Sequence, residues 1–208
     1  MSSKIAKETP TSVIWPIKNR APKAMNRQKI TKHIKQLGAT NCQCIASRLL
    51  MPKERIRNYC CEDKCGRYDK HLTCPPNTGT VSETREKLKG FKAGILIQYC
   101  KKIDVQNDKE GLRETKLKLH RMVLETEKYL KENLGFENIW GMIGGNCDLC
   151  DECAGYRDEP CEYPDEARAS MEAYAIDVVG LLKKLNLDTK FHKDKVTWTG
   201  IVLTDKEI

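Results

Sequence analysis

The stretch Ala93-Gly94-Ile95-Leu96-Ile97-Gln98-Tyr99-Cys100 decides the fold class of this chain. It is short, apolar almost throughout and free of proline, which is typical of a β-strand buried on both faces. A long helix is predicted after it, from about residue 109 to residue 133, and Gly135 is expected to close it. The apolar residues of that helix that fall on one stripe, and should be buried, are Leu112, Leu119, Met122, Val123, Leu130 and Leu134.

Shorter elements are predicted on both sides of this pair. In chain order they are a helix at 26–37 ended by Gly38, a strand at 42–46, a helix at 52–59 opened by Pro52, a helix at 82–89 with Ser82 as N-cap, a strand at 138–143, a helix at 165–185 and a strand at 195–204. The alternation of strands and helices predicts an α/β or α+β fold: a single small sheet flanked by helices, with two cysteine-rich metal-binding loops.

Length and composition predict one domain. The chain has 208 residues, 39% hydrophobic, 32% charged and 6% aromatic. Residues 1–25 contain Pro10, Pro16 and Pro22 without sustained periodicity and are interpreted as an N-terminal arm, which leaves 26–208 as a single cysteine-rich α/β domain. Apolar runs fall short of the roughly 18 residues that a membrane span needs. The first residues lack the apolar core of a secretion signal, so we expect a cytoplasmic protein.

The net charge of +8 is concentrated near the N-terminus. Residues 1–37 hold nine lysines or arginines against the single acid Glu8, and the rest of the chain is neutral. One interpretation is a solubilising tail that continues into a surface helix. The alternative is contact with nucleic acid or an acidic partner protein, although a basic patch without stacking aromatic residues specifies little.

Eleven cysteines are the strongest signal in the composition. A disulfide scaffold is one interpretation. However, an odd count, the lack of a secretion signal and a chain long enough to bury a core favour reduced thiols. Metal or redox chemistry is therefore expected.

One cysteine group has the spacing Cys147-x2-Cys150-x2-Cys153-x7-Cys161. Three thiolates at successive x2 spacing let a tight loop bind three corners of a 4Fe–4S cluster. The fourth thiolate, Cys161, follows a short intervening segment. All four are expected to bind the same cluster. Zinc is the alternative, although four-cysteine zinc sites usually pair two separate knuckles.

A second group reads Cys61-x3-Cys65-x8-Cys74-Pro75-Pro76 and supplies only three well-spaced thiols. One interpretation is that a distant residue completes a second cluster, with Cys60, Cys100, Cys42 and Cys44 as candidates. The other is that one iron stays open for a small ligand or substrate, as the open position of a catalytic zinc does.

The ordered combination of these two groups with Pro160-Cys161-Glu162-Tyr163-Pro164, Arg168-Ala169-Ser170-Met171-Glu172-Ala173 and Ile176-Asp177-Val178 resembles the predicted metal-binding proteins grouped as domain of unknown function 2284. The resemblance runs from about residue 30 to 205. The chain departs from that family at Asp69 and Ala175, where glycine is expected. The resemblance implies metal binding, with iron–sulfur as the expected kind, and supplies no substrate.

The remaining polar residues carry weaker signals. His71 lies inside the first cysteine loop and could be a ligand or a proton donor, but the favoured interpretation is a solvated loop residue. We expect the other three histidines on the surface: His33, His120 and His192.

Two functional hypotheses follow. The first is an iron–sulfur protein with two 4Fe–4S clusters, the Cys147 group transferring electrons from a redox partner protein and the Cys61 group performing redox or sulfur chemistry on a small molecule. The alternative is a non-enzymatic electron carrier, or a zinc-stabilised module whose basic arm contacts an acidic partner or RNA.

Overall fold

The computed structural model describes residues 20–208, so residues 1–19 of the expected arm lie outside the described part. Residues 20–25 belong to helix α1 (Arg20–Gln36), which starts six residues before the expected residue 26. Pro22 lies in its first turn, where a missing N–H costs no helical hydrogen bond. Within residues 20–208, every helix is too short or too polar to cross a lipid bilayer.

Four strands form one antiparallel sheet in the order β1-β2-β4-β3. Their bounds are β1 (Asn41–Ala46), β2 (Ala93–Lys102), β3 (Ile139–Met142) and β4 (Lys195–Thr204). The two central strands pair over ten residues, from Ala93 opposite Thr204 to Lys102 opposite Lys195. The predicted mixed fold with a single small sheet is confirmed, and the antiparallel pairing makes it the α+β form.

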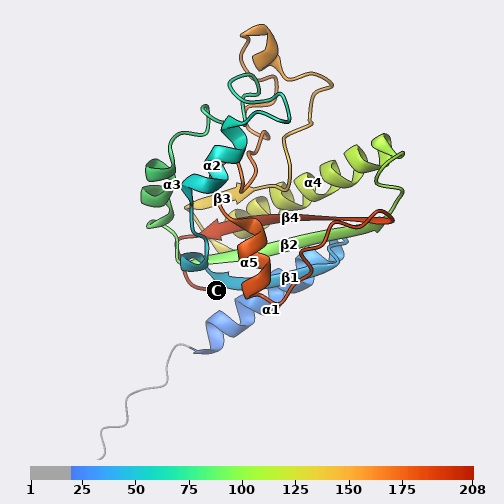
Figure 1. The fold of residues 1–208 in the computed structure, drawn as a ribbon. Coiled ribbons are helices and arrows are strands. Elements are labelled where there is room, and N and C mark those ends of the chain that lie inside the picture. The colour runs from blue at the N-terminus through green and yellow to red at the C-terminus, as the bar shows by residue number, and fades with distance from the viewer. Residues whose placement is uncertain (1–19) are drawn as a thin grey trace, which may run out of the picture.

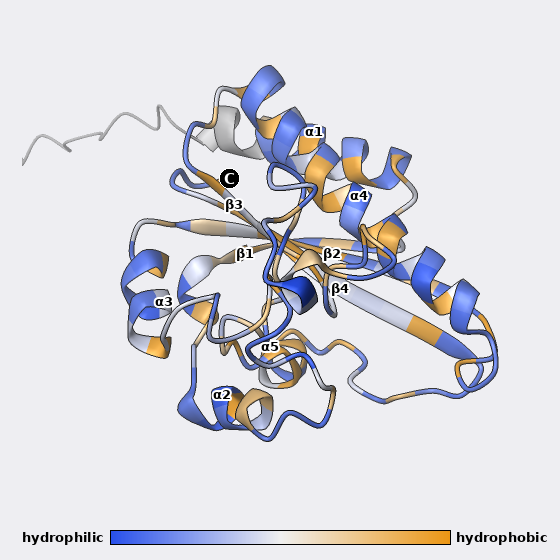
Figure 2. Cartoon of the chain, turned by 90° about the horizontal axis from the view of Figure 1, so that it is seen from above, coloured by the Kyte–Doolittle hydropathy of each residue, from blue (hydrophilic) through white to orange (hydrophobic). Residues whose placement is uncertain are grey.

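Helices cover both faces of this sheet (Figure 2). Ile95 and Ile97 of β2 pack with α1 and α4 (Lys109–Leu134), whereas Leu96 points to the opposite face and packs with α5 (Val178–Lys184). Burial on both faces explains why β2 is apolar without alternation.

Helix α4 follows its prediction closely. Four of the six predicted residues, Leu119, Met122, Val123 and Leu130, are fully buried, and Leu112 and Leu134 are partly buried. Gly135 ends the helix with a left-handed φ of 64°. The surface prediction for His120 is wrong: it is only 1% exposed, and its Nε2 lies 2.9 Å from the Glu166 carbonyl oxygen.

The helix predicted at 165–185 is also wrong, because only α5 is helical there. The preceding residues form turns, in which Ala175 takes a φ of 61° that a helix cannot contain. Asp177 then caps α5 by accepting a hydrogen bond from the Gly180 N–H.

Two shorter α-helices and two 3-10 turns complete the fold. The helices are α2 (Glu54–Cys61) and α3 (Val81–Leu88), and the turns are at Ser47–Leu49 and Ala154–Arg157. Pro52 pairs with Ile176 in a β-bridge instead of opening α2. Thr80, not Ser82, caps α3, because Thr80 and Glu83 form a reciprocal capping box.

The start of α2 is tied to the start of α5 through Asp177, whose side chain is only 8% exposed. Its carboxylate lies 2.7 Å from Lys53 Nζ and 2.5 Å from Arg55 Nη2. Burial alone would raise the pKa of Asp177, but hydrogen bonds from Lys53, the Gly180 N–H and Arg55 outweigh it and hold the pKa well below its usual range.

Replacing Ala175 by glycine is expected to stabilise the protein. A left-handed φ costs an alanine about 1–2 kcal/mol, and the greater backbone freedom of glycine in the unfolded chain returns part of that gain. We expect the free energy of unfolding to rise by roughly 0.5–1 kcal/mol, measured by urea denaturation. Ala173 is also buried but has no left-handed φ, so Ala173→Gly should destabilise. A loss of stability in Ala175→Gly would contradict this account.

Candidate metal centre

Both cysteine-rich segments lie at the same end of the molecule, on the side of edge strand β3 (Figure 1). The first follows α2, and the second follows β3 through Gly144 and Gly145. All eleven cysteines are free thiols in the structure.

The second group lines one cavity of about 270 Å³. Cys147, Cys150, Cys153 and Cys161 all contribute to its wall. Cys147 is buried and the other three are partly buried. The four thiols that the sequence grouped are therefore brought together around one space.

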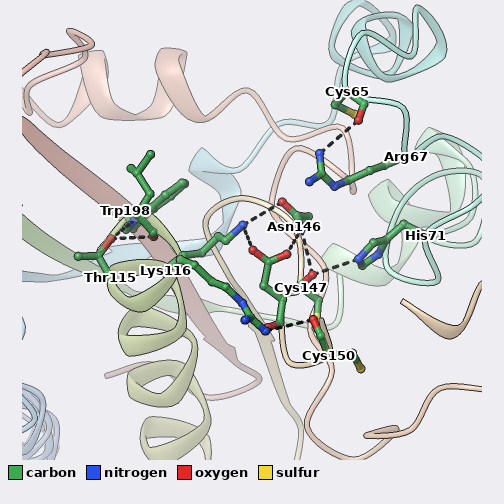
Figure 3. A network of polar contacts seen from close by, with 12 residues as sticks. Cys65, Arg67, His71, Thr115, Lys116, Asn146, Cys147, Cys150 and Trp198 are labelled. Carbon is green, nitrogen blue, oxygen red and sulfur yellow. Dashed lines mark hydrogen bonds and ion pairs between the residues drawn. The ribbon is translucent and has the colours of Figure 1, made fainter. Parts of the chain in front are cut away.

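Charged residues of α4 fix the loop that carries these thiols (Figure 3). Lys116 Nζ donates to Asn146 Oδ1 at 3.0 Å and pairs with the Asp148 carboxylate. Arg113 donates to the carbonyl oxygens of Asp148 and Cys150, each at 3.3 Å. The sequence missed these contacts because α4 lies about 30 residues away in the chain, a separation at which spacing rules carry no information.

Two thiols of this cavity, Cys147 and Cys150, are held in their neutral form. Burial raises the pKa of Cys147, although the backbone N–H groups of Leu149 and Arg168 oppose the shift. Burial, the Glu162 carboxylate and the neighbouring thiols raise the pKa of Cys150. Metal binding would release these protons, so metal affinity should increase with pH.

Cys60, one of the candidate fourth ligands, interacts electrostatically with the first group. Cys60 and Cys61 end α2, and the pKa of Cys60 is raised by burial and by the charges of Cys65 and Cys61. Burial, followed by the charges of Cys65 and Cys60, raises the pKa of Cys74 to about 12. Cys60 is therefore within electrostatic reach of Cys61, Cys65 and Cys74.

The other candidates for a fourth ligand lie elsewhere. Cys42 and Cys44 belong to β1 and pack against the core on the α1 side. Burial and the Cys44 charge raise the pKa of Cys42 to about 12, as expected for a buried thiol. Cys100 lies in β2, opposite Thr197 of β4.

His71 joins the two cysteine loops, so its favoured interpretation as a solvated residue is wrong. It is 5% exposed, and its Nε2 lies 3.0 Å from the Cys147 carbonyl oxygen. The Thr73 N–H donates to Nδ1, so Nε2 carries the proton and donates. Burial lowers the pKa of His71, which keeps the ring neutral. With both ring nitrogens engaged, His71 positions the Cys147 loop.

Further contacts hold the loops together. The Leu72 N–H donates to Cys153 Sγ at 3.5 Å, and the Tyr156 hydroxyl donates to the Gly66 carbonyl oxygen at 3.2 Å. Gly155 approaches the other loop so closely that an added Cβ would lie 2.2 Å from the Lys70 carbonyl oxygen.

Asp69 and Ala175, the two departures from the expected glycines, both have left-handed φ values, 58° and 61°. Asp tolerates this conformation better than alanine, because its short polar side chain can bond locally.

Within residues 20–208, no three histidine, cysteine, aspartate or glutamate side chains are arranged around a single metal-ion position.

The fold and the two thiol groups define a cysteine-rich protein suited to metal binding. The family described as "predicted metal-binding protein (DUF2284)" matches residues 43–204, and the chain belongs to this family. Neither a curated protein nor a solved structure matches the chain significantly.

Proposed function

We propose that the chain is an iron–sulfur protein with two 4Fe–4S clusters. Cys147, Cys150, Cys153 and Cys161 would hold one, and Cys61, Cys65 and Cys74 would hold the other, with Cys60 as the nearest further thiol. The observation that carries the proposal is the shared cavity of the Cys147 group, because its four thiols also have the x2-x2 spacing of cluster-binding loops.

Contacts between the loops support electron transfer between the two sites. The Leu72 N–H that reaches Cys153 lies two residues before Cys74, and the charge of Cys153 acts on Cys74. A bound cluster supplies one-electron redox chemistry. The Cys147 group would receive electrons from a redox partner protein in the cytoplasm.

The Cys61 group is suited to chemistry on a small molecule. Cys61 and Cys65 are exposed, whereas Cys147 is buried. Solvent access at these thiols supports an exchangeable position at the Cys61 site, as redox or sulfur chemistry requires. Under this proposal the protein is an oxidoreductase.

Anaerobic purification of the full chain, followed by iron, sulfide and zinc analysis, tests the proposal. We expect about eight iron and eight sulfide per chain, as two 4Fe–4S clusters require. Stoichiometric zinc without sulfide would contradict the proposal and favour the zinc-stabilised binding module. An iron content near four per chain would indicate a single cluster and favour a non-enzymatic electron carrier.

The Cys147 cluster is expected to have the lower reduction potential, because negative charge opposes the addition of an electron. Residues 147–168 carry eight acidic groups against two arginines, whereas residues 53–74 carry six basic groups against four acidic ones. Arg113 and Lys116 face the Cys147 loop and offset part of this difference. Redox titration of the wild type and Cys161→Ser assigns the two potentials. The reverse order would remove the electrostatic argument.

A further inference from the structure

A second cavity, of about 400 Å³, lies on the α5 side of the sheet. Residues of β4, the start of α4, α5 and the segment that joins α5 to β4 surround it. Its apolar walls include Val105, Leu112, Val178, Val179, Leu182 and Val196. A largely apolar cavity with few polar groups is the usual form of a small-molecule site.

One part of the wall of this cavity continues along the chain into the Cys147 loop. Gly144 and Gly145, which lead into the Cys147 loop, form one part of its wall, and Glu172 forms another. The charge of Glu172 contributes to the raised pKa of Cys60. A molecule bound here would contact Glu172, whose charge acts on Cys60.

Glu172 supplies a carboxyl group to this cavity. Burial raises the pKa of Glu172, hydrogen bonds from its own backbone N–H and from Ser170 oppose the shift, and the residue is exposed at the cavity wall. Within residues 20–208, no lysine, arginine or histidine lies within ion-pair distance of this carboxyl group. A carboxyl group that lines a cavity without a cationic partner is placed to accept hydrogen bonds from the N–H groups of a ligand.

Polar groups of the sheet lie in the same cavity wall. Gln98 Nε2 donates to Thr199 Oγ1 at 3.0 Å, and Asn41 fixes the Gln98 amide by donating to its oxygen at 2.9 Å. Both Gln98 and Thr199 are buried. These fixed side chains give the wall hydrogen-bonding capacity at defined positions.

The mouth carries an aromatic side chain. Phe191 lies in the segment between α5 and β4, lines the cavity and is 99% exposed. Asp188 anchors this segment by pairing with His192 at 2.7 Å and Lys195 at 3.6 Å, which also offsets the positive charge at the mouth. A wholly exposed phenylalanine beside an apolar cavity is placed to cover a ligand.

We propose that this cavity binds a small organic molecule with an apolar body and an amine or amide end. The N–H groups of that end donate to the Glu172 carboxyl, whose carbonyl oxygen accepts in either protonation state. Phe191 packs over the apolar body. Binding itself requires no cluster; that the ligand is a substrate delivered to the Cys61 group rests on the proposed function.

Three six-carbon probes of equal length test the polar end: hexylamine, hexanol and hexanoate. Isothermal titration calorimetry on the full chain, prepared without oxygen, should show hexylamine binding about tenfold or more tighter than hexanoate, since a charge-assisted hydrogen bond is worth about 1.5–3 kcal/mol. Glu172→Ala should weaken hexylamine binding about tenfold and leave hexanol binding within about twofold. Glu86→Ala, an exposed change on α3 outside the cavity, should alter neither.

Two further variants test the place of binding. Val179 is partly exposed at the cavity wall, so Val179→Trp should fill the cavity without unfolding the core and abolish binding of all three probes. Phe191→Ala should weaken hexylamine and hexanol alike, by about threefold.

The proposal fails if none of the probes binds, if hexanoate binds as tightly as hexylamine, or if Val179→Trp leaves binding unchanged. Iron analysis of the same samples separates it from the proposed function. If a protein without iron binds hexylamine, the proposed iron–sulfur function is contradicted and the cavity proposal stands. If an iron-loaded protein binds no probe, the cavity proposal is contradicted and the iron–sulfur function stands.

Discussion

Replacement of Cys161 by serine should remove one cluster and leave the other. Cys161 lines the same cavity as the three other thiols of its group, and a serine hydroxyl is a far poorer ligand for iron than a thiolate. We expect iron to fall from about eight to about four per chain, with the visible absorbance reduced by roughly half. Metal analysis and absorbance spectra of the anaerobic protein measure both.

Cys42→Ser is the matched control, because it makes the same chemical change in a thiol that packs against the core. Its iron content should equal that of the wild type, with stability lowered by no more than about 1–2 kcal/mol from the polar hydroxyl. If Cys161→Ser keeps all its iron, or if Cys42→Ser loses half, the assignment of the Cys147 group is wrong.

Gly155→Ala is expected to separate the two cysteine loops. An added Cβ would lie 2.2 Å from the Lys70 carbonyl oxygen and 3.0 Å from Leu72 Cγ. Because the first of these atoms belongs to the backbone, no rotamer change relieves the clash. The Leu72 hydrogen bond to Cys153 should be lost with the contact, and the free energy of unfolding should fall by about 1–3 kcal/mol, as in overpacked cores.

Two measurements on Gly155→Ala report these effects. Urea denaturation gives the stability, and electron paramagnetic resonance of the fully reduced protein gives the magnetic interaction between the clusters, which should weaken. Gly90→Ala is the control, since the nearest atom to its added Cβ is 3.4 Å away. Wild-type stability together with an unchanged interaction in Gly155→Ala would refute the close packing of the loops.

The strands could be predicted because their signal is local. Continuous apolar sequence marked β2, and β4 was predicted with both of its ends correct. Helix α4 followed from the periodicity of its apolar residues. In contrast, the sequence at 165–177 favours a helix, but the left-handed Ala175 and the cap at Asp177 delay it to Val178. Tertiary contacts overrode local propensity there.

The buried histidines could not be predicted, because their partners are distant in the chain. His71 meets Cys147 across 76 residues, and His120 meets Glu166 across 46. Spacing grouped the cysteines within each loop but carried no information on how the loops pack. The position of Cys60 beside Cys65 and Cys74 likewise depends on how α2 ends, which the adjacent pair Cys60-Cys61 does not specify.

The attachment of Lys53 and Arg55 to Asp177 makes α2 and α5 a mechanical unit. One end of that unit carries Cys60 and Cys61, and the other borders the cavity at Val178 and Val179. A ligand that shifts α5 is therefore expected to change the metal affinity of the thiols. By thermodynamic reciprocity, metal binding to the thiols must then change the affinity of the cavity for its ligand by the same factor.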